Sequence, residues 1–259
     1  MDELAPVSQF KGTDLVPAPS ALSAPRELTS LANVDQGDLV LPYLVLAQPG
    51  NFQTLADTTG ATDVMPGMFV NSMNGQVARP PIRALVVHHN KSRALQPDKD
   101  KTEYDGLEMC LSRDGIVGTV YGSCATCPHA KWRENGQRNK PLCTESAVFA
   151  LLTPSGPAML RVKKSTKQNT AAVKNILSAA IFDEKELWDR YLVIGSEKQS
   201  GKTASGKDTT YYTYTLSWLR TDEVPEQLVE AAKRMHDRVD TAYQAGRLDT
   251  DEGGHEAEV

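Results

Sequence analysis

All four cysteines of this 259-residue chain lie within 34 residues of one another. They are Cys110, Cys124, Cys127 and Cys143, with the spacing C-x13-C-x2-C-x15-C. A two-residue gap lets both thiolates of a knuckle face one metal ion, and two further cysteines complete a tetrahedral site. The stretch KWRENGQRNK is too polar to build a core of its own, so a bound metal would supply the missing stabilisation. We therefore predict a structural Zn²⁺ site in an insert at residues 105–145.

Other uses of the same cysteines stay open. An iron–sulfur cluster also takes four cysteines, and the spacing does not exclude one. His129 could replace a cysteine as ligand, most readily the isolated Cys110, and free thiols are a further alternative. A thioredoxin-like redox pair is disfavoured, because no strand-to-helix pattern leads into the CxxC and two more cysteines accompany it. A four-thiolate zinc site keeps no open position, so the predicted role is structural.

The distribution of apolar residues predicts the cellular compartment of the protein. No run of about 18 apolar residues is present, which excludes a membrane-spanning helix and a membrane partner. The N-terminal stretch MDELAPVSQFKGTD is acidic and lacks the apolar run of a signal peptide. We therefore expect a cytoplasmic protein, in a reducing compartment where cysteines are ligands or free thiols rather than disulfides.

Charge is segregated along the chain, although its formal net charge is only −5. Residues 1–60 carry a net of −5, residues 61–220 a net of +7, and residues 221–259 a net of −7. A basic middle between acidic ends indicates a polyanion-binding core with tails that compete for the same surface. The alternative is that the three segments mix in space and no single surface is basic.

Composition divides the chain into four parts. Residues 1–36 are rich in Ala, Pro, Ser and Thr, which predicts a flexible arm. Residues 37–220 form the predicted nucleic-acid-binding domain. Residues 221–248 show an apolar stripe at helical spacing after Pro225, which predicts a C-terminal helix. Residues 249–259 hold five acids and no base, which predicts a disordered acidic tail.

The order of apolar runs predicts a mainly β fold with accessory helices. Asn74-Gly75 between two short runs indicates a tight hairpin. IRALVVHH reads as the next strand, and two β-runs follow the cysteines, joined by PSGP. A helix at 167–182 then precedes two more strands, RYLVIG and TTYYTYTLSWL. A helix between the third and fourth strands is the order of the OB-fold, so we predict an OB-like five-stranded barrel with a zinc-binding insert and a C-terminal helix.

Basic and aromatic residues recur together in the middle of the chain. Proteins that bind single strands need cations along the backbone and aromatic faces on which bases stack, each worth about 1–3 kcal/mol. The alternative is that one tyrosine face is core and the lysines serve solubility. The candidate nucleic-acid-binding residues are Arg83, Lys91, Arg93, Lys131, Trp132, Arg133, Arg161, Lys163, Lys164, Lys202, Tyr212 and Tyr214.

Two motifs that resemble catalytic or phosphate-binding sites are rejected. GSEKQSGKT has five residues between Gly195 and Gly201, whereas a phosphate loop has four and continues into a helix. His88 and His89 are adjacent in a strand, so they point to opposite faces, and we interpret them as an exposed strand end. No nucleophile or paired-acid arrangement stands out, and we expect no enzyme activity.

The cluster CATC…PLC, the strand–helix–strand order around TAAVKNILSAA and the tail DTDEGGHEAEV carry a resemblance to a known family. In architecture, residues 60–259 resemble the bacteriophage single-stranded-DNA-binding, or helix-destabilising, proteins. The best-known zinc-bearing members use three cysteines and a histidine, whereas four cysteines are present here. The resemblance implies a protein of the host cytoplasm that coats DNA during replication and recombination. It also implies that the acidic tail docks replication and recombination proteins and occludes the DNA groove.

The predicted function is binding of single-stranded DNA without strong sequence preference. The alternative is a zinc-knuckle protein-interaction module that serves as a replication or transcription accessory factor. An iron–sulfur nuclease is a third, enzymatic possibility.

Overall fold

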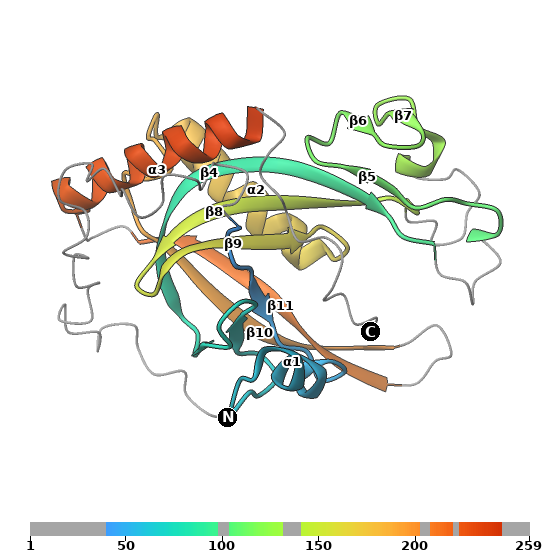
Figure 1. Cartoon of the computed structure of the whole chain (residues 1–259), viewed down its shortest axis with the longest axis horizontal. Coiled ribbons are helices and arrows are strands. Elements are labelled where there is room, and N and C mark those ends of the chain that lie inside the picture. Colours follow the sequence, from blue (N-terminus) through green and yellow to red (C-terminus); the bar gives the residue numbers. More distant parts are fainter. Residues whose placement is uncertain (1–39, 98–103, 132–140, 203–207, 220–222, 245–259) are drawn as a thin grey trace, which may run out of the picture.

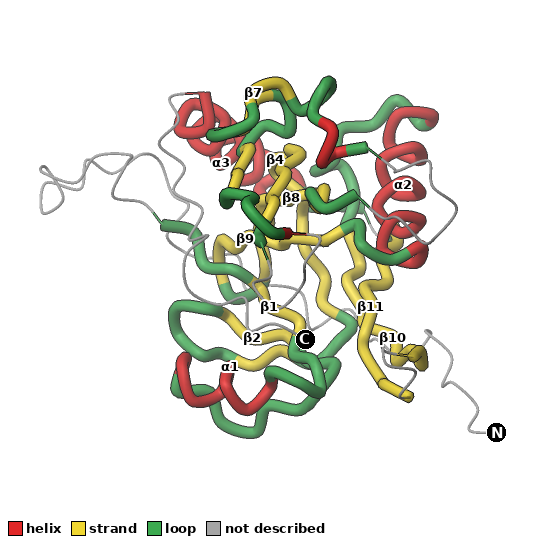
Figure 2. The backbone as a smooth tube through the Cα atoms, turned by 90° about the vertical axis from the view of Figure 1, so that its right-hand side faces the viewer, coloured by secondary structure: helices red, strands yellow, loops and turns green. Residues whose placement is uncertain are grey.

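The computed structural model describes residues 40–97, 104–131, 141–202, 208–219 and 223–244. The predicted arm at 1–36 and the predicted tail at 249–259 lie outside these ranges. The described residues form a mainly β structure with three α-helices (Figures 1 and 2), which confirms the coarse fold prediction. In these residues no helix has both the length and the apolar character needed to cross a membrane.

The largest described sheet has the strand order β11-β10-β4-β8-β9, and its ladders are antiparallel. Helix α2 (Lys167–Phe182) connects β9 to β10, as the apolar spacing predicted. Thr166 caps this helix by accepting a hydrogen bond from the backbone N–H of Asn169. The strands are β4 (Ile82–Leu95), β8 (Thr144–Thr153), β9 (Gly156–Lys163), β10 (Leu192–Lys202) and β11 (Asp208–Trp218).

Strand β4 is longer than predicted. The sequence indicated an end at His89, but the strand continues to Leu95 and pairs with β8 along most of its length. The register shifts between Val86 and His88, and a β-bulge of this kind bends a strand and increases its twist. Beyond the bulge, β4 and β8 form an arm that reaches the cysteine insert (Figure 1).

The insert between β4 and β8 is built from short elements. Strand β5 pairs with the far end of β4, and β6 pairs with β7 in a small ribbon. The elements are β5 (Cys110–Ser112), β6 (Val117–Gly118), β7 (Gly122–Ser123) and a 3₁₀ turn at Pro128–Ala130.

A small N-terminal sheet extends the large one beyond β9. It contains β1 (Leu44–Leu46), β2 (Phe69–Asn71) and β3 (Val77–Ala78), with α1 (Phe52–Thr59) between β1 and β2. The backbone N–H of Met159 in β9 donates to the carbonyl of Pro42, just before β1, at 2.7 Å. The predicted turn at Asn74-Gly75 joins β2 and β3, and Gly75 has a φ of 66°.

Two hydrophobic cores lie on opposite faces of the large sheet. The first, around Phe149 and Leu160, is closed by β1, β2 and α2. The second, around Leu85 and Val87, is covered by α3 (Glu226–Gln244), which lies within the range 221–248 where a C-terminal helix was expected. Figure 2 shows α2 and α3 on opposite sides of these strands.

The outer edge of β11 is held by two side-chain amides instead of a neighbouring strand. Gln48 accepts a hydrogen bond from the N–H of Tyr212 (2.8 Å) and donates to its carbonyl (3.0 Å). Asn169 accepts from the N–H of Tyr214 and donates to the carbonyl of Lys163 at the end of β9, each at 3.0 Å. Among the described strands no backbone ladder joins β9 to β11, and the side chain of Asn169 bridges these two strands in place of a closed five-stranded ring.

Candidate nucleic-acid interface and cysteine site

The four cysteines line one small cavity of about 10 Å³ in the insert, and Arg93, Tyr121 and His129 also contribute to its wall. All four are free thiols. Three of them are buried and Cys124 is partly exposed. The structure thus brings together residues that are up to 33 positions apart in the sequence.

Backbone hydrogen bonds shape the knuckle. The N–H of Cys127 donates to the carbonyl of Ser123 (3.0 Å), and the N–H of Cys124 donates to Ile116 (2.8 Å). The N–H of Cys143 donates to the carbonyl of His129 (2.9 Å), which fixes the start of β8 against the 3₁₀ turn. These bonds hold the cysteine-bearing loops in place around the cavity.

The surroundings of Cys143 in the cavity disfavour its ionised form. Burial raises the pKa of Cys143 to about 11, and the three other thiols add to this effect while Arg93 opposes it. Cys143 therefore stays protonated at neutral pH unless a cation enters. Within the described ranges no group of three or more His, Cys, Asp or Glu side chains stands ready to hold a metal ion. The Zn²⁺ site stays a prediction, and so does the alternative in which His129 is a ligand.

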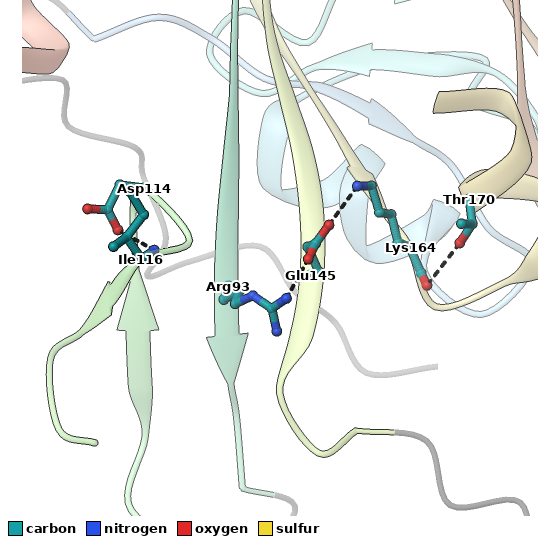
Figure 3. Close-up of polar contacts among 6 residues, drawn as sticks. All are labelled: Arg93, Asp114, Ile116, Glu145, Lys164 and Thr170. Atoms are coloured by element: carbon teal, nitrogen blue, oxygen red, sulfur yellow. Dashed lines mark hydrogen bonds and ion pairs between the residues drawn. The ribbon is translucent and has the colours of Figure 1, made fainter. Parts of the chain in front are cut away.

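A cluster of charged residues lies next to the insert, where β4 and β9 end and β8 begins. Glu145 of β8 accepts from Arg93 of β4 at 2.5 Å and from Lys164, just past β9, at 2.6 Å (Figure 3). The three side chains are between 14% and 26% exposed. Burial acts to raise the pKa of Glu145, but Lys164, Arg93 and Lys91 outweigh it and hold that pKa below its ordinary value.

Lys91 belongs to the same face of the sheet. It lies two residues before Arg93 in an unbroken stretch of β4, so both side chains point the same way. Its own side chain is exposed. Three of the predicted cations, Lys91, Arg93 and Lys164, are therefore brought together, and we call them with Glu145 the strand-end cluster.

The two adjacent histidines are not an exposed strand end, which corrects the sequence interpretation. Both lie in the middle of β4 and are partly buried. The ring of His89 packs on Phe149 with a centroid distance of 4.9 Å. Burial, assisted by Lys164, His88 and Lys91, lowers the pKa of His89 to about 4.

His88 points to the opposite face, where it meets α3. Its ring centroid lies 5.8 Å from that of His236, and its Nδ1 is 3.9 Å from a carboxylate oxygen of Asp240. Burial lowers the pKa of His88, and His236 adds to this shift while Asp240 opposes it.

Other predicted cations lie on the α3 face of the sheet. Arg161 is opposite Val148, a residue of the second core, and its guanidinium stacks over the ring of Tyr43 at 5.4 Å. Lys163, two residues further along β9, shares this face and is exposed. Arg83 shares the face of Leu85 for the same reason. The predicted cations are thus divided between two surfaces.

The remaining predicted residues are spread. Lys202 is exposed at the end of β10, and Lys131 is exposed in the insert. Trp132 and Arg133 lie outside the described residues. Tyr212 and Tyr214 both pack against the first core, so their rings serve packing.

The environment of each tyrosine explains this placement. Burial raises the pKa of Tyr214, whose ring lies 6.1 Å from that of Phe69. The ring of Tyr212 lies over Gly67, where an added Cβ would come within 2.6 Å of it. Alternation along TTYYTYTLSWL predicted two faces, and the structure assigns the Tyr212–Tyr214 face to the core.

Comparison of the chain with protein-family models, with curated proteins and with solved structures gives no match. A functional interpretation therefore depends on the geometry above.

Proposed function

We propose that this protein binds single-stranded DNA without strong sequence preference, in DNA replication or recombination. The observation that carries the proposal is the strand-end cluster, where cations from β4 and from the end of β9 meet on one face beside the cysteine insert. Lys91 is exposed there, and Arg93 and Lys164 are partly exposed, so a sugar–phosphate backbone has access to all three. Contacts of this kind are independent of base sequence.

The order of the strands supports an OB-like interpretation. Strands β4, β8 and β9 form a meander, α2 follows, and β10 returns to lie beside β4 with β11 outside it. This is the order of an OB-fold, in which the loops after the first and fourth strands flank the binding surface. Here the cysteine insert follows the first of these strands. The β10–β11 ribbon projects toward the same side as the β4–β8 arm in Figure 1.

We further propose that Cys110, Cys124, Cys127 and Cys143 hold one structural Zn²⁺. Support comes from their shared cavity, their free thiols and the raised pKa of Cys143, which a divalent cation would reverse. The metal would supply the insert with the stabilisation that its few buried apolar residues do not provide. It would also help to hold Arg93 in its place in the strand-end cluster, because Arg93 borders the cavity.

Fluorescence anisotropy with labelled oligo(dT) tests the DNA proposal. The affinity should fall steeply as salt rises, because bound phosphates release counterions. Lys91→Ala should weaken binding and reduce the slope of log K against log[salt] by about 0.7. Lys233→Ala, on the far face in α3, removes the same charge and should bind like the wild type. A flat salt response, or equal affinity for duplex DNA, contradicts the proposal.

A second candidate function is a protein-interaction module, and one observation favours it. Large apolar side chains are exposed in the insert, and surface groups of this kind often mark protein contacts. They are Met109 (58%), Ile116 (65%), Val117 (59%) and Val120 (41%). Gel shifts with single-stranded and duplex DNA separate the two functions, because an interaction module would shift neither.

A further inference from the structure

Glu145 occupies a position that resembles that of a bound phosphate. Each of its two carboxylate oxygens takes one cation, Oε2 from Arg93 and Oε1 from Lys164. A phosphodiester offers the same chemistry, since two non-bridging oxygens share one negative charge. Guanidinium and ammonium groups bind carboxylates and phosphates alike through charge-assisted hydrogen bonds.

We propose that Glu145 is a built-in competitor of the DNA phosphate, which pairs with Arg93 and Lys164 until a single strand displaces it. The inference rests on the proposed function and names the regulation of the same site. The proposal predicts that the wild-type protein binds single-stranded DNA more weakly than it would without the charge of Glu145. Weaker binding favours release of the protein and its movement along DNA.

The backbones of Arg93 and Lys164 are held by contacts that do not involve the carboxylate of Glu145. The carbonyl of Lys164 accepts from Thr170 Oγ1 at 3.3 Å (Figure 3). The N–H of Lys164 donates to the backbone carbonyl of Glu145 at 2.8 Å. Arg93 sits in the middle of a three-strand ladder, opposite Ser112 on one side and Glu145 on the other. Removing the carboxylate charge therefore leaves two cations in place and available to a phosphate.

The test is the substitution Glu145→Gln, which keeps the shape of the side chain and removes its charge. With oligo(dT), binding should tighten on the order of fivefold to tenfold. The salt slope should steepen by about 0.7 for each cation that newly meets a phosphate. The matched control is Glu230→Gln on α3, which frees Lys233 on the opposite face of the sheet and should leave both quantities unchanged.

The outcomes separate this inference from the proposed function. If neither wild type nor Glu145→Gln binds oligo(dT), the proposed function fails and the competitor role fails with it. If wild type binds and Glu145→Gln binds equally or more weakly, only the competitor role is overturned.

A measurement on the wild-type chain covers the case in which Glu145→Gln does not fold. Carbon NMR of the Glu145 side-chain carboxyl reports directly on its partners. Addition of oligo(dT) should shift this signal as Arg93 and Lys164 are taken over by phosphate. An unmoved signal at saturating oligo(dT) overturns the proposal.

Discussion

At the scale of single residues, one face of β4 carries a neutral histidine among positive charges. His89 is titrated only near pH 4, because burial and the neighbouring Lys164, His88 and Lys91 all disfavour its charged form. It therefore adds no charge to the strand-end cluster at neutral pH. The positive charge there comes from Lys91, Arg93 and Lys164, and the last two share the single negative charge of Glu145.

The low pKa of His89 predicts a loss of stability in mild acid. In the unfolded chain the pKa of a histidine is near 6.5, whereas the pKa of His89 in the folded protein is about 4. Between these two pH values, the unfolded state therefore binds a proton at His89 that the folded state does not bind. The free energy of unfolding should fall as pH decreases across this window, by about 3 kcal/mol from this group, with no further loss below it.

Urea unfolding at several pH values between 7 and 4 measures this effect. His89→Gln removes the titrating group and should flatten the dependence of stability on pH. Asn90→Gln, on the same strand, alters no titratable group and should keep the wild-type slope. An unchanged slope in His89→Gln would show that other residues cause the acid sensitivity.

At the scale of elements, local sequence patterns predicted the helices and strands that pack one apolar face against a hydrophobic core. The helix 167–182, the hairpin at Asn74-Gly75 and the pair β8–β9 all follow from apolar spacing and turn residues. The continuation of β4 past His89 did not, because HNKSRAL faces a charged cluster and the insert instead of an apolar core. The pairing of Arg93 with Glu145, 52 residues apart, depends on strand register, which no local pattern reveals.

Helix α3 is joined to the bulge in β4 by one hydrogen bond. Nδ1 of His236 donates to the carbonyl of Val87 at 2.7 Å, since a carbonyl can only accept. The ring of His236 also packs on Trp188, with centroids 4.9 Å apart. The bulge takes Val87 out of the β4–β8 register, so the carbonyl of Val87 accepts a hydrogen bond from α3 instead of from β8.

His236→Ala should therefore loosen α3. Leaving the Val87 carbonyl without its partner should cost about 1–3 kcal/mol of unfolding free energy. Urea unfolding measures the loss, and a change in the fluorescence of Trp188 in the folded state reports on the local packing. Arg238→Ala, at an exposed position of the same helix, should have little effect. Wild-type stability in His236→Ala would mean that the apolar contacts of α3 suffice.

We expect the stability of the cysteine insert to depend on a bound metal ion. Protein purified under reducing conditions should contain about one zinc per chain, and a chelator should lower the melting temperature. Cys143→Ser should lose the metal, whereas His129→Ala should keep it if all four cysteines are ligands. Elemental analysis with thermal unfolding measures both. Brown protein with visible absorbance after anaerobic purification would favour the iron–sulfur alternative.

At the scale of the whole molecule, the cations of the basic middle segment lie on two faces of the sheet. The strand-end cluster lies on the α2 side, and Arg161 and Lys163 lie on the α3 side. The sequence showed that the middle of the chain is basic, but alternation along β9 divides its charges in a way that composition does not reveal.

The acidic end at 249–259 should compete with DNA for this basic region. We propose that it also docks replication or recombination proteins. Deleting residues 249–259 removes five acids and should tighten binding to oligo(dT), most strongly at low salt where charges are least screened. Anisotropy titrations of full-length and truncated protein at two salt concentrations measure the change. Weaker binding after truncation would contradict competition.

The hydrogen bonds from the side-chain amides of Gln48 and Asn169 to β11 have a consequence for solubility. An uncovered strand edge is a template on which another copy of the chain can add a strand, and it leads to aggregation. Gln48 occupies both backbone groups of Tyr212 that such a strand would use. If the chain folds before Gln48 contacts β11, the edge of β11 is open to pairing with another copy of the chain. The side chain of Gln48 therefore lowers the tendency of the protein to self-associate.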